Sequence, residues 1–239
     1  MTKRRSVARP KRERVRVREA RRGRELLVDG TFASFYEPGR FVTGSVWDAI
    51  AAPLLVLPPA RRRRILVLGL GGGSVARIVR ALAPKAVVVG VEFDADVLRT
   101  ARSHFDLDSL GIEVVLADAR RFLREDRRRF DAVLEDVFVG AGDAVHKPPW
   151  LPLPGYALAR ERLAPGGLLV ANALDEAPQV SRALADLLPG QVRIEVEDFD
   201  NHIYAAGPAH LSARELRTAV AASPLLAPTL PRLRFKTIR

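Results

Sequence analysis

From residue 61 onward the chain alternates short, almost wholly apolar segments with amphipathic ones, and this pattern restricts its fold more than any other feature. Apolar segments of five to seven residues are typical of strands buried on both faces. We predict such strands over residues 65–69, 86–92, 112–116, 130–136 and 168–173. Helices are predicted over residues 74–82, 95–104, 119–125, 155–163 and 179–187. The expected fold class is therefore α/β, with a doubly wound, mainly parallel, Rossmann-like sheet.

The segment before this series has the pattern of a small antiparallel β unit. Arg and Val alternate over residues 14–18, and two further strands are predicted over 25–28 and 31–36. Asp29-Gly30, between them, is a hairpin dipeptide. We divide the chain into a disordered basic arm over 1–12, a β unit with a short helix over 13–60, a Rossmann-like domain over 61–210, and a C-terminal helix and tail over 211–239.

The net charge of +11 is concentrated at the amino end. Residues 1–24 hold 12 Lys or Arg and 2 acids, a local charge of +10, whereas the other 215 residues hold 27 basic and 26 acidic side chains, a charge of +1. Such an arm is typical either of a segment that binds nucleic-acid phosphates or of a solvated tail. Nucleic acid is therefore a candidate partner through these residues alone.

Other compositional features exclude several classes of protein. The chain has no Cys, and its four His are scattered, so we predict neither disulfides nor a metal site. No apolar run approaches the roughly 20 residues that a membrane helix needs. The basic amino end is not followed by the apolar segment of a secretory signal. We expect a cytoplasmic protein that does not span a membrane.

The loops after the predicted strands are the expected ligand site, because open α/β sheets bind ligands beyond the carboxyl ends of their strands. After the first strand, Gly69, Gly71, Gly72 and Gly73 allow the backbone to approach a ligand and to turn directly into a helix. Glu92 ends the second strand, where a carboxylate can accept both hydroxyls of a ribose. That arrangement suits NAD and S-adenosylmethionine equally. Alternatively, Glu92 is a strand-end acid exposed to solvent with no ligand.

Two further strands also end in acids. Asp118, followed by Ala119, can accept the exocyclic amine of adenine or cap the next helix, and the two roles are compatible. An acid at this position favours an S-adenosyl ligand over NAD. Asp136 ends the fourth strand, where the sulfonium of such a ligand is expected, and it is the candidate base. Glu135 precedes Asp136 in the strand and is expected to point to the opposite face of the sheet. Alternatively, Asp136 is a strand-end acid exposed to water with no catalytic role.

As a set, these motifs resemble the polyamine aminopropyltransferases, the spermidine and spermine synthases, within the class I S-adenosylmethionine-dependent methyltransferase-like superfamily. The resemblance covers about residues 13–206. Its motifs are the glycine loop, Val91-Glu92-Phe93-Asp94, Asp118-Ala119, Phe130-Asp131 leading into Asp136, Leu27–Gly30 and Leu163–Gly167. The resemblance implies that a polyamine displaces the aminopropyl group of decarboxylated S-adenosylmethionine in an SN2 reaction.

By position, the resemblance also implies a role for each motif. Glu92 would bind the ribose, Asp118 and Ala119 the adenine, and the backbone of residues 69–74 the rest of the donor. Asp136 would accept or orient the proton of the attacking amine. The family further implies a homodimer and a loop, residues 137–150 here, that closes over the site.

Three positions depart from the family pattern. Gly72 stands where the family has an Asp that meets the donor amine, and Val139 stands at its second acid. Trp47-Asp48-Ala49 replaces a Tyr-His-Glu run that helps bind the polyamine. A methyltransferase that uses S-adenosylmethionine itself and a non-catalytic nucleoside- or nucleic-acid-binding protein therefore stay open. The remaining candidates for substrate contacts are Tyr36, Glu37, Trp47, Asp48 and Asp143.

Overall fold

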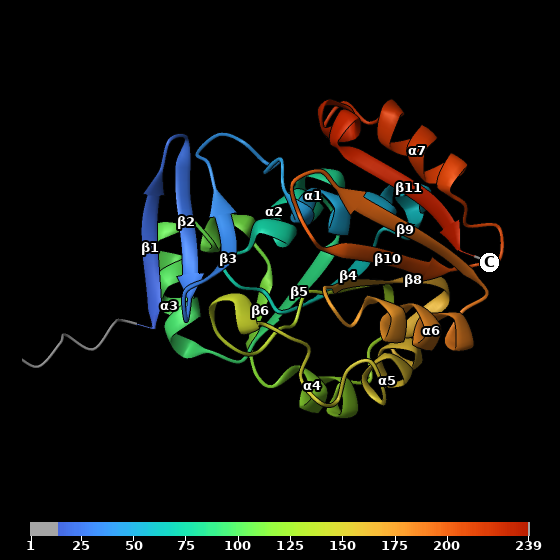
Figure 1. Cartoon of the computed structure of the whole chain (residues 1–239), viewed down its shortest axis with the longest axis horizontal. Helices are drawn as coiled ribbons and strands as arrows, with labels where there is room; N and C mark the ends of the chain where they lie inside the picture. The colour runs from blue at the N-terminus through green and yellow to red at the C-terminus, as the bar shows by residue number, and fades with distance from the viewer. Residues whose placement is uncertain (1–13, 239) are drawn as a thin grey trace, which may run out of the picture.

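The computed structural model describes residues 14–238, which form two β-sheets with helices around the larger one (Figure 1). The arm predicted over 1–12 lies outside these residues. The smaller sheet is antiparallel and contains β1 (Val15–Ala20), β2 (Gly23–Val28) and β3 (Thr31–Tyr36). Asp29 and Gly30 both have positive φ, as the predicted hairpin turn requires.

Among residues 14–238, the larger sheet has eight strands in the order β11-β9-β10-β8-β7-β4-β5-β6. Its parallel part is β4 (Arg64–Leu68), β5 (Val87–Glu92), β6 (Glu113–Leu116), β7 (Phe130–Glu135) and β8 (Leu163–Ala173). The chain runs outward from β4 through β5 to β6, and then returns to the other side of β4 with β7. This reversal opens a crevice at the carboxyl ends of β4 and β7.

One edge of this sheet is antiparallel. It contains a hairpin of β9 (Gly190–Val196) and β10 (His202–Gly207). A strand that we did not predict, β11 (Leu233–Ile238), pairs with β9 at the outer edge. Its sequence alternates apolar and polar residues, but the nearby prolines favoured an irregular tail.

Helices cover both faces of the sheet, which confirms the doubly wound α/β fold (Figure 1). One apolar core joins the sheet to α1 (Val46–Ala51), α2 (Ser74–Leu82) and α7 (Ala213–Ala222). The core on the other face includes α4 (Ala119–Glu125), α5 (Gly155–Glu161) and α6 (Ala177–Leu187). No helix within residues 14–238 is long and apolar enough to cross a membrane.

The small sheet is held against the carboxyl edge of the large one. Leu26 packs with residues of α3 (Ala95–His104) and with Phe105, which follows it. Ser74 connects the glycine loop to β3, because its Oγ donates to the Phe35 carbonyl at 2.8 Å and accepts from the Phe35 N–H at 2.9 Å. The small sheet therefore forms one wall of the crevice.

Candidate active site

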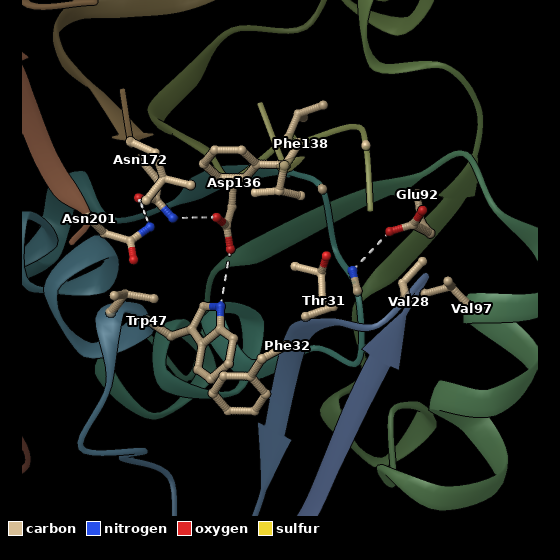
Figure 2. A pocket seen from close by; sticks show the side chains of 18 of the residues that line it. Val28, Thr31, Phe32, Trp47, Glu92, Val97, Asp136, Phe138, Asn172 and Asn201 are labelled. Atoms are coloured by element: carbon tan, nitrogen blue, oxygen red, sulfur yellow. Dashed lines mark hydrogen bonds between the residues drawn. The ribbon is translucent and has the colours of Figure 1, made fainter. Parts of the chain in front are cut away.

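A cavity of about 250 Å³ lies in this crevice, between the strand ends and the small sheet (Figure 2). The large sheet contributes the turn after β4 and the residues that follow β5, β7 and β8. The small sheet and α1 contribute the opposite wall. Residues on the cavity surface include Thr31, Phe32, Trp47, Gly69, Gly71, Glu92, Asp94, Asp136, Phe138, Asn172 and Asn201.

Asp136, directly after β7, is fixed in the cavity by two side-chain donors (Figure 2). Its Oδ2 accepts from Trp47 Nε1 at 3.1 Å, and its Oδ1 accepts from Asn172 Nδ2 at 2.7 Å. Asn201 Nδ2 donates in turn to Asn172 Oδ1 at 2.9 Å. Removal from solvent raises the pKa of Asp136 to about 6, although these donors and the charge of Lys147 act to lower it. The carboxylate thus has a fixed orientation and a pKa close to neutrality.

Glu92, at the end of β5, lies across the cavity from Asp136 (Figure 2). Its Oε2 accepts from the Gly71 N–H at 2.9 Å, and its Oε1 accepts from Phe93 at 3.0 Å and Asp94 at 3.1 Å. Burial raises the pKa of Glu92, while these backbone donors oppose the rise. The carboxylate is therefore positioned by the backbone of two neighbouring loops.

The glycine loop needs its glycines for two separate reasons. Gly69, Gly71 and Gly73 have φ values of 79°, 54° and 89°, in the region that other residues rarely adopt. Gly72 is restricted by packing, because its N–H donates to Ser34 Oγ at 2.7 Å and a Cβ on it would lie 2.8 Å from Ser34 Cβ. The small sheet occupies the space that an Asp side chain at position 72 would need.

A smaller hollow of about 120 Å³ adjoins the cavity and is lined by Asp118 and Ala119. It shares five lining residues with the cavity, namely Gly69, Glu92, Phe93, Val137 and Phe138. Asp118 also caps α4, because its Oδ1 accepts from the Arg121 N–H at 2.8 Å. The structure thus brings Asp118, Glu92 and Asp136 to one continuous edge of the sheet.

Asp48 does not reach this cavity, although it lies next to Trp47 in sequence. Its Oδ1 accepts from the N–H of Thr43 at 2.8 Å and from Thr43 Oγ1 at 2.9 Å, and its Oδ2 accepts from the Gly44 N–H at 2.8 Å. The carboxylate is buried, and desolvation raises its pKa. Asp48 therefore organises the loop before α1.

Tyr36 and Glu37 also lie outside the cavity lining. The Arg77 guanidinium lies over the Tyr36 ring, 4.5 Å from its centroid. Glu37 forms an ion pair with Arg40 at 3.6 Å. Of the four substrate contacts predicted within residues 36–48, the structure brings only Trp47 to the cavity. The side chains of Tyr36, Glu37 and Asp48 have partners elsewhere.

Glu135 points away from the cavity, as the alternation along β7 predicts, and forms a buried ion pair. Lys147 Nζ lies 2.6 Å from Glu135 Oε1, and both side chains are 1% exposed. Tyr156 donates its hydroxyl to Glu135 Oε2 at 2.9 Å. Lys147 Nζ also donates to the Val137 carbonyl at 2.9 Å and lies 3.8 Å from the centroid of the Phe138 ring. These contacts hold both ends of the loop 137–150 against the sheet.

The middle of this loop reaches the turn between β2 and β3. Val139 and His146 form an antiparallel bridge, which makes the loop a narrow hairpin. Its tip is attached by the Gly142 N–H, which donates to the Asp29 carbonyl at 3.2 Å, and by Thr31 Oγ1, which donates to the Gly142 carbonyl at 3.3 Å. Together, the loop and the small sheet enclose the cavity.

Several cavity residues were not predicted from the sequence. Asn172 interrupts an otherwise apolar strand, and this was a usable signal, because buried amides need partners. Phe32 and Asn201 carried no comparable signal, since they reach the cavity only through the packing of the small sheet and the β9–β10 hairpin. Within residues 14–238, no group of three or more His, Cys, Asp or Glu side chains is arranged to hold a metal ion.

Comparison with known proteins relates parts of this chain to two groups of enzymes. A family model described as "Methyltransferase domain" matches residues 65–148, from β4 to the loop over the cavity. A polyamine aminopropyltransferase of Chromobacterium violaceum is 31% identical over 163 residues, which are 62% of this chain and 60% of that protein. A probable polyamine aminopropyl transferase of Bifidobacterium longum is 29% identical over 151 residues, 62% of this chain and 32% of that protein.

The fold is also found among solved structures. A probable spermidine synthase from Corynebacterium glutamicum superimposes with a TM-score of 0.74 at 20% identity, covering 93% of this chain and 86% of that one. The chain spans a third to three fifths of the two sequence relatives described above. The predicted resemblance is confirmed: the chain has homologues named polyamine aminopropyltransferases and the class I S-adenosylmethionine-dependent methyltransferase-like fold.

Proposed function

We propose that this homologue of the polyamine aminopropyltransferases is a transferase that moves an aminopropyl group from decarboxylated S-adenosylmethionine to an amine. The observation that supports the proposal most is the position of Asp136. It faces the same cavity as Glu92 and the glycine loop, and each of its oxygens already accepts one hydrogen bond. A carboxylate has acceptor capacity beyond two bonds, so Asp136 can still accept from an amine.

In this proposal the nucleoside of the donor lies along the sheet edge. Glu92 accepts from the ribose hydroxyls, and Asp118 with the Ala119 backbone meets the adenine in the smaller hollow. The backbone of Gly69 and Gly71, which both line the cavity, lies along the donor. The continuity of the two hollows, which share Glu92 and Gly69, supports this path.

The proposed chemistry is an SN2 displacement. The lone pair of a neutral amine attacks the aminopropyl carbon next to the sulfonium sulfur, and the C–S bond breaks with its electron pair going to sulfur. Methylthioadenosine leaves as a neutral thioether, and Asp136 accepts or orients the proton that the new ammonium loses. Because the sulfonium is already an activated leaving group, the residues of this chain mainly supply alignment and exclude water.

Methyl transfer from S-adenosylmethionine is the alternative, and one observation favours it. The packing of Gly72 against Ser34 leaves no room for a carboxylate that would meet the donor amine. The match of residues 65–148 to a methyltransferase model agrees with this alternative. The implied homodimer, the cytoplasmic location and the nucleic-acid role of the amino-terminal arm stay predictions.

Two measurements separate the two reactions. Calorimetry compares methylthioadenosine with S-adenosylhomocysteine, the by-products of aminopropyl and methyl transfer, and we expect tighter binding of methylthioadenosine. Mass spectrometry of reactions with each donor then identifies the group added to the amine. Tighter binding of S-adenosylhomocysteine, or addition of a methyl group, would replace the proposal by its alternative. Unchanged turnover in Asp136→Asn would exclude Asp136 as the base.

A further inference from the structure

We infer that the acceptor is a primary monoamine with an apolar body rather than a diamine or polyamine. The inference rests on the proposed function, because it takes the Asp136 end of the cavity as the acceptor site. It depends on the distribution of charge around that cavity. Among the described residues, the carboxylates on the cavity surface are Glu92, Asp94 and Asp136, and no Lys or Arg lines it.

Two of these three carboxylates are engaged at the other end. Glu92 is held by the backbone N–H groups of its own turn and of the glycine loop. Asp94 forms an ion pair with Arg14 and caps α3, accepting from the Asp96 N–H at 2.9 Å. Both belong to the donor side of the cavity, so Asp136 is the carboxylate left for an acceptor.

The residues that line the cavity around Asp136 are apolar or neutral (Figure 2). Phe32 and Trp47 pack edge to face, with centroids 5.0 Å apart, and Phe138 lies near the carboxylate on the other side. Asn172 and Asn201 are polar neighbours: Asn172 Nδ2 donates to Asp136, and Asn172 Oδ1 accepts from Asn201 Nδ2. Other residues of this lining are Val46, Leu174 and Phe199.

This lining suits one cationic nitrogen. A buried charge is costly unless it is paired, and Asp136 together with the aromatic faces can compensate a single ammonium. A second ammonium on the same molecule would lie among apolar side chains, whereas a methyl group there would gain from burial. An amino acid is disfavoured as the acceptor, because no Lys or Arg lines the described cavity to pair with its carboxylate.

The test compares n-pentylamine with putrescine, which differ by a methyl group in place of one ammonium. Each is titrated calorimetrically into the protein, with and without methylthioadenosine. We expect n-pentylamine to bind at least about tenfold more tightly, which corresponds to about 1.4 kcal/mol. Equal or tighter binding of putrescine, or no binding of either amine at millimolar concentration, would overturn the inference.

A variant that adds a charge gives a second readout. Leu174→Asp places a carboxylate on the cavity wall, and we expect it to reverse the preference towards putrescine. Leu153→Asp is the matched control, because Leu153 is exposed and lines neither hollow, so its preference should stay that of the unmodified protein. If both variants preferred putrescine, the change in preference would be due to the overall charge of the protein, and this result would contradict the inference.

The failure of this inference is distinguishable from failure of the proposed function. Preferential binding of n-pentylamine without release of methylthioadenosine from decarboxylated S-adenosylmethionine would refute aminopropyl transfer and leave the amine class intact. Release of methylthioadenosine with putrescine as the better acceptor would support the transfer and refute the monoamine.

Discussion

Replacing Lys147 by Met tests whether the buried ion pair with Glu135 holds the loop over the cavity. The substitution keeps most of the side-chain volume but removes the cation, which leaves the Glu135 carboxylate buried with only the Tyr156 hydroxyl and the Val137 N–H as donors. Breaking a pair buried to this degree costs about 3–5 kcal/mol. Domains of this kind have roughly 5–15 kcal/mol of stability, so the variant should still fold with a much smaller reserve.

Urea unfolding followed by circular dichroism measures this loss. Lys85→Met is the matched control, because Lys85 is exposed and its substitution should change the free energy of unfolding by less than about 0.5 kcal/mol. The double variant Glu135→Gln/Lys147→Met should recover much of the loss, since no unpaired charge is then buried. A loss below about 1 kcal/mol in Lys147→Met, the range of exposed pairs, would refute this reasoning.

Four further predictions concern the cavity and the glycine loop beside it. Since Asp136 acts in its ionised form in the proposed mechanism and has a pKa of about 6, kcat/KM should fall roughly tenfold per pH unit below that value, and Asp136→Asn should lose this limb together with activity. The pKa of Asp136 is raised from 3.8 to about 6, so between pH 3.8 and 6 the native state binds more protons than the unfolded state. The contribution of Asp136 to the free energy of unfolding should therefore decrease by about 3 kcal/mol as the pH rises to 6. Asp136→Asn should lack this pH dependence in unfolding titrations. Trp47→Phe removes a donor that lowers the pKa of Asp136, so the acidic limb of the rate profile should move to higher pH, and an unmoved limb would argue against the Trp47 contact. Gly72→Ala should cost about 1–3 kcal/mol by overpacking against Ser34, and Ser34→Gly should restore part of it in the double variant; additive losses in urea would contradict this explanation.

Features with a local cause were predictable from the sequence. The strands β4 to β7 are short, mainly apolar runs, and the acids Glu92, Asp118 and Asp136 lie at or just after the ends of β5, β6 and β7. Parallel strands bring their carboxyl ends to one edge, so three separate local patterns specify one shared crevice. That is why the fold and the sheet side of the cavity could be anticipated.

Features that depend on tertiary partners could not be predicted in this way. Tyr36, Glu37 and Asp48 were candidates by sequence position, but Arg77, Arg40 and the loop at 43–44 occupy their side chains. Strand β11 was missed because the residues of β9 with which it pairs lie 37 to 47 positions earlier, and because neighbouring prolines favoured a tail. These outcomes were decided by contacts between segments distant in the sequence.

The cavity takes its two sides from separate stretches of the chain. The side that we propose for the nucleoside consists of turns that the central sheet itself needs, such as the glycine loop and the end of β5, whereas Phe32 and Trp47 come from the small sheet and α1. Under the proposed function, mutations of Phe32 and Trp47 would change the side that binds the amine without disturbing the strand order of the large sheet. If the proposed function holds, acceptor preference in such a scaffold can diverge between descendants of one gene while the binding of the sulfonium nucleoside is inherited unchanged.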